Sequence, residues 1–398
     1  MRQSLDEKVL PLGKPVIKLP DRSVKLTLAE LAFVQSIATC HIAFSVTLAC
    51  ALRCAHCIVR AGPDKAFTTM SVDTARHYAR QMKDLAEHGI TNISCTGGEP
   101  LLAPKQVGIL VDAAAEQGIS SGIVTSAYWA RRPESARRVI KRFRAIKEWD
   151  ISVDAFHQEF VSLDTIQNAY QAVKDAGHRV TVRFTHSDPP SAADIQILEF
   201  ITTLEDANFT SQQVRGLGRG ADLGVACSHT GNRWMKPCLT QGMVIRYDGS
   251  IAPCCLNLIE ERQHPFQFGD AAAQPLCKIH DAYLSFPLLQ LIRAIGFSEC
   301  WRWIGEEGLR SRLPADLPHD ACDFCSLIMR DPVVSACLTR KTSDPDMRLK
   351  IAVAVKRILG ETVMLSSVLN ELADCADRIQ GFEEAKACLA APAGNSAS

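Results

Sequence analysis

Three cysteines that follow a short apolar segment are the residues of this sequence best suited to chemistry. Cys50, Cys54 and Cys57 have the spacing C-x3-C-x2-C. Three thiolates on one loop can hold three irons of a cubane iron–sulfur cluster and leave the fourth iron open to a small molecule. The alternatives are a zinc site, which usually takes four protein ligands from C-x2-C pairs, and a chance group of buried thiols. The spacing favours the cluster.

A second motif follows the next predicted strand, residues 91–96. Gly97, Gly98 and Glu99 stand there in a row. Two glycines let the backbone approach a ligand closely and expose N–H and C=O groups to it. The Glu99 carboxylate can receive an ammonium group. An ordinary turn between a strand and a helix is the alternative, since a lone Gly-Gly-Glu carries little weight.

Together the two motifs resemble the radical S-adenosylmethionine (radical SAM) enzymes over about residues 40–220. The C-x3-C-x2-C signature and the Gly-Gly-Glu motif of that family occur here in the same order, and His56 stands at a position that is usually aromatic. The resemblance implies a [4Fe–4S] cluster whose open iron chelates S-adenosyl-L-methionine. It also implies an oxidoreductase-like enzyme that cleaves this cofactor with one electron, and a 5′-deoxyadenosyl radical that takes a hydrogen atom from the substrate. A flavodoxin- or ferredoxin-type protein is the expected electron donor.

Further cofactor contacts are expected on two later strands. Ser152 and Asp154 lie on one face of the predicted strand 149–154, where family members often carry polar residues that reach the ribose. Arg183, on the predicted strand 179–185, is a candidate partner for the cofactor carboxylate. A strand-end cap and a solvated charge are the alternatives. His157 and Glu159, on the following loop, are expected to face the substrate.

A second group of cysteines lies beyond residue 232. Cys238 and Cys254 flank Gly249 in the pattern C-x10-G-x4-C, and Cys322 and Cys325 form a later C-x2-C pair. This pattern resembles the auxiliary-cluster domains of the same superfamily. The seven-cysteine form, called SPASM, continues with cysteines at fixed spacings that are missing here, so the shortened form, called twitch, is the better match.

Four thiolates from this second group would hold one auxiliary [4Fe–4S] cluster. Cys255 is an alternative to Cys254 as ligand. A structural zinc ion in the same four thiols is the alternative occupant.

The elements that must position these residues alternate along the chain. Strands are predicted at 42–48, 91–96, 119–125, 149–154, 179–185 and 211–215, and helices at 72–88, 104–117, 133–147, 162–176 and 191–206. Repeated βα units imply a parallel sheet with right-handed connections. The predicted fold class is therefore α/β, a partial (βα)6 TIM-like barrel with its chemistry at the carboxyl ends of the strands, followed by a small cysteine-rich α+β domain.

The domain boundaries follow from shifts in pattern along the chain. The predicted parts are an N-terminal extension at 1–40, the barrel at 41–220, the auxiliary-cluster domain at 232–340, C-terminal helices at 341–390 and a disordered tail at 391–398. Residues 216–231, rich in glycine and polar groups, are expected to be a linker.

Composition and charge indicate which partners and which cellular compartment to expect. The 44 Lys and Arg residues balance 44 Asp and Glu residues, so no net field attracts nucleic acid or membrane surfaces. The 16 cysteines are not preceded by a signal peptide, which favours reduced thiols in the cytoplasm. Residues 31–52 carry no charged side chain but alternate with period two from His41, which predicts a strand and not a membrane span.

The sequence is compatible with two classes of substrate. The first is a ribosomally made peptide that is crosslinked, oxidised or epimerised, and the second is an amino sugar, nucleotide or cofactor precursor. About 40 residues precede the first predicted strand, too few for the recognition domain of many peptide maturases, so a separate recognition protein is an expected partner for a peptide. A non-catalytic iron–sulfur or zinc protein is the remaining alternative.

Overall fold

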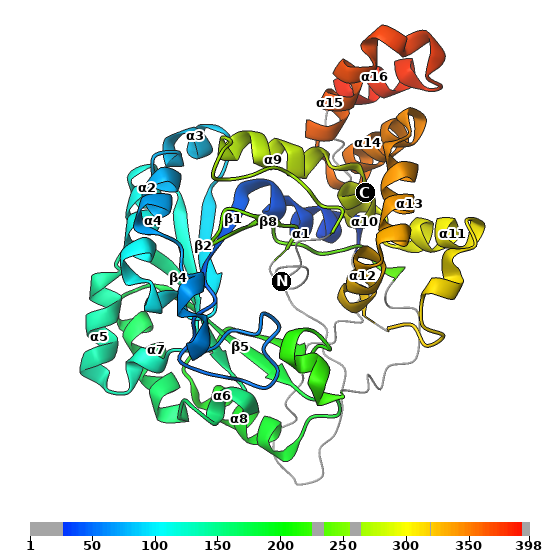
Figure 1. The fold of residues 1–398 in the computed structure, drawn as a ribbon. Coiled ribbons are helices and arrows are strands. Elements are labelled where there is room, and N and C mark those ends of the chain that lie inside the picture. Colours follow the sequence, from blue (N-terminus) through cyan, green and yellow to red (C-terminus); the bar gives the residue numbers. More distant parts are fainter. Residues whose placement is uncertain (1–26, 225–234, 255–263, 319, 392–398) are drawn as a thin grey trace. The chain divides into compact units, whose positions relative to one another are not determined.

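The computed structural model describes residues 27–224, 235–254, 264–318 and 320–391 (Figure 1). The chain divides into two compact units. Among the described residues, the first unit comprises residues 45–76 and 93–224. The second comprises residues 27–44, 77–92 and those from 235 onward.

Parallel strands form the framework of the first unit, and the one at the end of their order, β1 (His41–Thr47), starts in the second unit. In sheet order they are β6 (Phe209–Gln213), β5 (Arg179–His186), β4 (Ile146–Val153), β3 (Ser120–Thr125), β2 (Asn92–Gly97) and β1. The register is parallel from β3 to β6, with Thr125 opposite Ile151 and Ser152 opposite Arg183. Six parallel strands in this order confirm the predicted α/β class and agree with a partial TIM-like barrel.

Helices join these strands and cover one face of them. They are α2 (Val72–Ala79), α4 (Pro104–Glu116), α5 (Pro133–Arg142), α6 (Ala155–Gln158), α7 (Leu163–Asp175) and α8 (Ala192–Thr203). Helix α4 contacts β3, and α7 contacts β4 and β5 (Figure 1). Buried Ile151, Val153 and Val182 alternate along these strands with less buried Ser152 and Arg183. Alternation therefore directs the polar side chains to the opposite face of the sheet.

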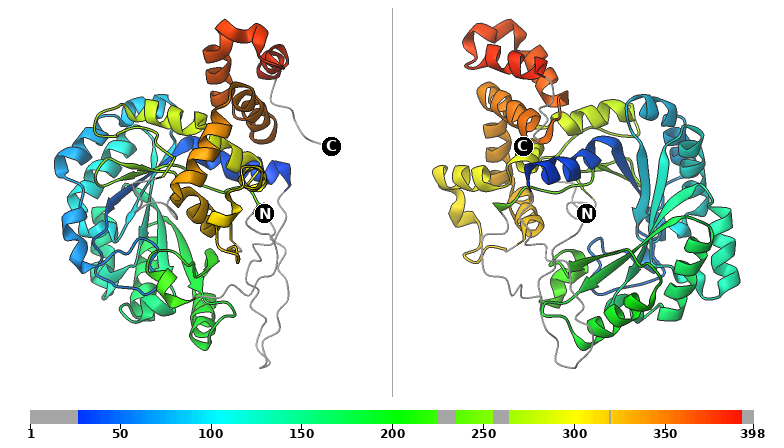
Figure 2. Two further views of the ribbon diagram at one scale, coloured as in Figure 1. Left: turned by 45° about the vertical axis from the view of Figure 1, so that its right-hand side comes forward. Right: turned by 180° about the vertical axis from the view of Figure 1, so that it is seen from behind.

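The second unit is mainly helical. Its helices are α1 (Leu28–Cys40), α3 (Met82–Glu87), α9 (Leu276–Ser285), α10 (Pro287–Ala294), α11 (Ser298–Glu306), α12 (Ala321–Arg330), α13 (Pro332–Ser343), α14 (Pro345–Leu359), α15 (Val363–Leu372) and α16 (Phe382–Ala390). Helices α14, α15 and α16, orange to red in Figure 2, contact one another. The antiparallel hairpin of β7 (Val244–Arg246) and β8 (Ile251–Ala252) joins the start of β1, where the Ala43 N–H donates to Met243 O at 3.1 Å.

The region after residue 232 is more helical than the sequence suggested. The positions of its prolines explain the difference. Pro287, Pro332 and Pro345 each stand at the first turn of a helix. That position tolerates proline, because the missing N–H would have no helical partner there. Prolines interpreted as turns therefore mark helix starts. The helices expected over residues 345–390 are present.

Two predicted boundaries in the first half of the chain are wrong. The single helix expected at 72–88 is two helices, α2 and α3. Between them the Gln81 N–H donates a hydrogen bond to Tyr78 O, three residues earlier. Helix α5 ends at Arg142, five residues early, and β4 begins at Ile146. Buried Phe143 and Ile146 continue the helical spacing of Ile140, so a prediction from periodicity alone extends the helix into residues that form the strand.

Several expectations fall outside the described residues: most of the N-terminal extension, most of the tail, part of the linker and Cys255. Within the part of the chain that the structure describes, no helix is both long enough and apolar enough to cross a membrane.

Candidate active site

Cys50, Cys54 and Cys57 lie on the loop that leaves β1 at its carboxyl end. Cys50 and Cys54 are buried and Cys57 is half-buried. Burial raises the pKa of the Cys50 thiol to about 12, and the charges of Glu99, Cys54 and Cys57 raise it further. The Cys50 thiol is thus near enough to Glu99, Cys54 and Cys57 for their charges to affect its pKa. A metal must displace the thiol proton of such a group, so ligation and deprotonation are coupled here.

Gly97 and Gly98 hold the cysteine loop from the neighbouring strand. The Gly98 N–H donates to Thr47 O at 2.6 Å, and the Glu99 N–H donates to Ala49 O at 2.8 Å. A Cβ at Gly98 would lie well under 3.0 Å from Ala49 O, and one at Gly97 would do the same to Thr47 O. Only glycine allows this approach, so the motif sets the position of the residue that precedes Cys50.

A second glycine turn holds the other end of the loop. Gly218 has a φ of 56°, and a Cβ there would meet the carbonyl oxygens of Cys57 and Ile58. Next to it, Arg219 donates its backbone N–H to Cys57 O and its Nε–H to Cys54 O, both at 2.9 Å. The residues expected to be a linker therefore include a clamp on the cysteine loop.

The Glu99 carboxylate is fully buried and is bound by the end of β3. It accepts hydrogen bonds from the Ser126 N–H at 2.9 Å, the Ser126 hydroxyl at 2.7 Å and the Thr125 hydroxyl at 2.9 Å. The Leu101 N–H, at 3.3 Å, is a fourth donor. Burial raises the pKa of Glu99, and the hydrogen bonds from Ser126, Thr125 and Leu101 oppose that change. Glu99 thus ties the glycine motif to the neighbouring strand.

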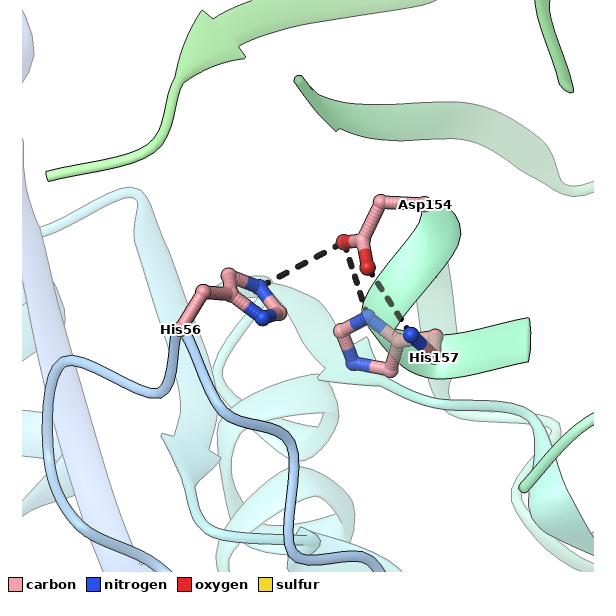
Figure 3. A group of neighbouring side chains, drawn as sticks. All are labelled: His56, Asp154 and His157. Carbon is pink, nitrogen blue, oxygen red and sulfur yellow. Dashed lines mark hydrogen bonds and ion pairs between the residues drawn. The ribbon is translucent and has the colours of Figure 1, made fainter. Parts of the chain in front are cut away.

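Asp154, expected at the cofactor ribose, lies in a buried trio with two histidines (Figure 3). One carboxylate oxygen caps α6 by accepting the N–H groups of Phe156 at 3.0 Å and His157 at 2.9 Å. The other oxygen lies 2.8 Å from Nδ1 of His157 and 3.4 Å from Nε2 of His56. Asp154 is 1% exposed, so both oxygens serve contacts inside the protein.

His157, expected to face the substrate, binds Asp154 through Nδ1, and its pKa also responds to Cys54 on the cysteine loop. The Asp154 charge and the hydrogen bond to it raise the pKa of His157 well above its usual value, against the effect of burial, and His157 in turn lowers the pKa of Asp154. His56 stacks on Phe156 with ring centres 4.6 Å apart, and burial lowers its pKa to about 4.

The remaining predicted cofactor contacts face each other across two strands. Ser152 on β4 is directly opposite Arg183 on β5. Arg183 also binds the Asp150 carboxylate, with Nη2 at 2.6 Å and Nε at 2.8 Å. Both side chains are partly exposed on the polar face of the sheet, where Arg183 is pre-oriented by its carboxylate partner.

The four auxiliary cysteines converge in the second unit. Cys325 is buried, and its pKa is raised well above the usual value by burial and by the charges of Cys238, Cys254 and Cys322. Cys322 and Cys325 lie on the first turns of α12, three residues apart and so on one face. The charge of Cys300 also raises the pKa of the Cys325 thiol, although the spacing of Cys300 in the sequence did not mark it as part of this group.

The hairpin between Cys238 and Cys254 explains the glycine in that pattern. Gly249 has a φ of 84° at the turn from β7 to β8, and its N–H donates to Arg246 O at 3.0 Å. This backbone conformation favours glycine. Nearer the first cysteine, the Cys238 N–H donates to Ile292 O at 2.8 Å, and Gln35 Nε2 donates to Cys238 O at 2.6 Å.

The chemistry of the four auxiliary thiols suits either an iron–sulfur cluster or a structural zinc ion. Across the described residues, the trio of metal-binding side chains whose ligand atoms all lie within 4.8 Å of one another is His56, Asp154 and His157.

A family model decides the class of the first unit. Residues 44–201, which run from β1 into α8 and include the three cysteines and the glycine motif, match the Radical SAM superfamily. This segment is a radical SAM domain. Such a domain implies an enzyme that uses S-adenosylmethionine and an iron–sulfur cluster, as the resemblance of the two motifs implied. No curated protein sequence matches the chain.

Several solved structures are similar to the chain that carries this radical SAM domain. One is anSMEcpe with bound AdoMet and Kp18Cys peptide, at 12% identity over 66% of this chain and 86% of that one, with a TM-score of 0.46. Another is Streptococcus suis SuiB bound to precursor peptide SuiA, at 16% identity over 73% and 71%, with a TM-score of 0.44. BtrN in complex with AdoMet and 2-DOIA has 16% identity over 64% and 87%, with a TM-score of 0.38.

Sequence reasoning missed the residues that hold the radical SAM motifs in place. Thr125 and Ser126 receive Glu99, and Arg219 binds the cysteine loop. For Arg219 a signal existed, since the Gly-Arg run after the sixth strand resembles a turn found in this family. For Thr125 and Ser126 the signal was their place directly at the end of a strand beside the motif.

Proposed function

We propose that the protein is a radical SAM enzyme that cleaves S-adenosylmethionine reductively and takes a hydrogen atom from a ribosomally made peptide. The observation that carries the first half is the grouping of Cys50, Cys54 and Cys57 near Glu99, inside the segment that matches the family model. When bound, a [4Fe–4S] cluster supplies the electron that breaks the sulfonium and yields the 5′-deoxyadenosyl radical.

The three cysteines would hold this cluster through deprotonated thiolates. Because burial raises the pKa of Cys50, its thiol keeps its proton until a metal displaces it, so loading of the site would release that proton. Gly97, Gly98 and Arg219 keep both ends of the loop in place. The backbone of Gly97 and Gly98 is the proposed contact for the amino group of the cofactor.

Glu99 contributes to cofactor binding mainly through position. Its carboxylate accepts hydrogen bonds from Thr125, Ser126 and the backbone of Leu101, so little of it is left for a ligand. We expect its negative charge to favour the cofactor ammonium group while its hydrogen bonds fix the glycine backbone. Ser152 and Arg183, opposite each other on the polar sheet face, are the proposed contacts for the ribose and the carboxylate of the cofactor.

The auxiliary site is the part of the proposal that bears on the substrate. Cys238, Cys254, Cys322 and Cys325 are proposed to hold one [4Fe–4S] cluster, which would accept the electron that the substrate radical loses. Crosslinking and oxidation of a peptide both require such an acceptor, because the substrate radical must lose an electron and a proton to reach a closed-shell product. A flavodoxin- or ferredoxin-type donor would supply electrons to the first cluster, and a separate recognition protein would deliver the peptide.

Mass spectrometry tests this proposal directly. The reconstituted, reduced protein is incubated with S-adenosylmethionine and with peptides encoded beside its gene, and in parallel with amino sugars and nucleotides. A peptide whose mass changes by the loss of two hydrogens, together with formation of 5′-deoxyadenosine, is the expected result. Conversion of a small molecule instead would overturn the peptide assignment and keep the radical chemistry.

A further inference from the structure

Helix α5 and the short segments that flank it form a strongly basic surface of the first unit. Residues 131–147 carry eight basic side chains and one acidic side chain, a net charge of +7 in a chain whose total is zero. All eight basic residues are exposed. We name the Lys and Arg side chains of residues 131–147 the α5 basic face.

Little inside the protein neutralises the α5 basic face. The one acidic residue of the segment, Glu134, pairs with Arg137 at 3.2 Å. Arg138 and Lys141 have no ion-pair partner among the described residues. The positive charge of this face is therefore directed to solvent, where it attracts acidic partners.

The chemistry of the segment selects the kind of acidic partner. Its apolar side chains Ala136, Ile140 and Phe143 are buried, so nothing apolar is left to enter a membrane surface beside the basic groups. Phe143 is also the one aromatic residue of the segment, so no exposed ring offers a stacking platform to single-stranded nucleic acid. An acidic protein surface is the partner that remains.

The position of α5 separates this partner from the substrate. Figure 1 shows α5 at the outside of the helical layer, and α5 contacts α7. The proposed cofactor contacts Ser152 and Arg183 lie on the opposite, polar face of the sheet. A protein on the α5 basic face would therefore leave the polar face free for cofactor and substrate.

The start of the α5 basic face is linked to the cysteine loop by three hydrogen bonds. Trp129, two residues before the face begins, donates Nε1–H to Thr125 Oγ1 at 3.0 Å. The Thr125 hydroxyl donates to Glu99 at 2.9 Å, and the Glu99 N–H donates to Ala49 O at 2.8 Å. Ala49 directly precedes Cys50, so a protein bound here would lie on the side of the domain that leads to the proposed cluster.

We propose that the α5 basic face docks a flavodoxin-type electron donor through the acidic surface of the donor. The inference rests on the proposed function, because it names the partner that reduces the cluster held by the cysteine loop. One electron passes from the donor to the cluster, so the donor flavin goes from hydroquinone to semiquinone while the cluster is reduced by one electron. Complementary charge speeds the encounter of two proteins and fixes their orientation.

The test measures docking and electron delivery separately on the reconstituted full chain. The probe is a purified acidic flavodoxin, and calorimetry follows its binding in the oxidised state at low and high salt. Formation of 5′-deoxyadenosine is then measured with two reductants. One is flavodoxin with its reductase and NADPH, and the other is dithionite, a small reductant that needs no docking surface.

Two variants remove the charge in steps. Arg138, Lys141 and Arg142 lie at i, i+3 and i+4 and so form one stripe of α5. All three are changed to Gln in the first variant and to Glu in the second, which lowers the net charge of residues 131–147 from +7 to +4 and to +1. The matched control changes three exposed basic residues of the second unit to Glu, namely Lys83, Lys350 and Arg357.

The expected result is a graded loss of docking. Wild-type binding should weaken as salt rises, because exposed charges are screened. At low salt the Kd for flavodoxin should rise about tenfold in the Glu variant and by less in the Gln variant. Flavodoxin-driven product should fall in the same order, while dithionite-driven product and the control should match the wild type. Circular dichroism and iron content show that each variant is folded and loaded.

Two results would overturn the inference. One is a folded Glu variant that binds flavodoxin as tightly as the control variant does, including the case in which it loses binding of single-stranded DNA or of phosphatidylglycerol vesicles instead. The other is an equal loss of dithionite-driven product at full iron content, which would assign the basic face to the structure of the enzyme itself. A wild type without 5′-deoxyadenosine even under dithionite would instead overturn the proposed function, and it is distinguished because dithionite bypasses docking.

Discussion

Replacement of Gly98 by Ala tests whether the glycine motif exists to hold the cysteine loop. The new Cβ would lie well under 3.0 Å from Ala49 O, and backbone cannot move aside as a flexible side chain can. Overpacking of this kind costs about 1–3 kcal/mol. The hydrogen bonds from the Gly98 N–H to Thr47 O and from the Glu99 N–H to Ala49 O are strained as well, at about 1 kcal/mol each.

Together these effects predict a loss of about 3–5 kcal/mol from the free energy of unfolding, on the same two magnitudes. Because Ala49 precedes Cys50, the first iron site should also be disturbed. The assays are chemical denaturation and iron content after anaerobic reconstitution. We expect Gly98→Ala to lose most of the iron of the first cluster and to keep that of the auxiliary site.

Gly108 offers a matched control for the same substitution. It lies inside α4, and a Cβ there would meet nothing within 4 Å. Alanine in a helix interior is favoured over glycine by about 1 kcal/mol, so Gly108→Ala should be slightly more stable and keep its iron. A Gly98→Ala protein as stable and as rich in iron as Gly108→Ala would refute the steric reasoning.

Three further predictions concern the second unit. Burial lowers the pKa of His280 to about 4, so below about pH 6.5 the unfolded chain binds more protons than the folded one. The free energy of unfolding should therefore fall by about 3 kcal/mol as the pH drops to 4. His280→Gln should make the free energy of unfolding depend less on pH, as measured by denaturation at several pH values. Arg293 is fully buried and binds Glu361 at 2.7 and 3.0 Å, so Arg293→Met should cost about 3 kcal/mol in chemical denaturation, and an unchanged midpoint would show that the pair is dispensable. Changing Cys322 and Cys325 to Ala should abolish substrate product while 5′-deoxyadenosine still forms in chromatographic assays; a soluble variant with full product would exclude both an electron-accepting and a structural role.

The parts of the fold that depend on local pattern were predictable from the sequence. Alternating apolar residues along β4 and β5 and glycines at helix ends indicated the βα order, and cysteine spacing singled out the two candidate metal-binding groups. The parallel sheet then follows from handedness rules that need no side-chain detail. The strand starting at Ile146 was missed because Phe143 and Ile146 extend a helical spacing that the chain does not follow.

The contacts that link distant segments were not predictable. Nothing near His157 in the sequence indicates an influence of Cys54. Cys54 lies about 100 residues earlier on the loop after β1, whereas His157 follows β4, and two strands separate β1 from β4 in the sheet. The same is true of Arg219 on the cysteine loop. A position at a strand's carboxyl end narrows the choice of partners, but which side chains meet depends on register and loop geometry.

The measurement closest to the central claim is 5′-deoxyadenosine formed from S-adenosylmethionine by the reduced, reconstituted protein. Wild type should hold about eight irons, as two [4Fe–4S] clusters require, and should release 5′-deoxyadenosine slowly without substrate. Changing Cys50, Cys54 and Cys57 to Ala should remove about half of the iron and all of this product. A control that changes Cys40, Cys277 and Cys388 should behave as wild type. Stoichiometric zinc without iron in the wild type, or 5′-deoxyadenosine at the wild-type rate from the first triple variant, would contradict the account.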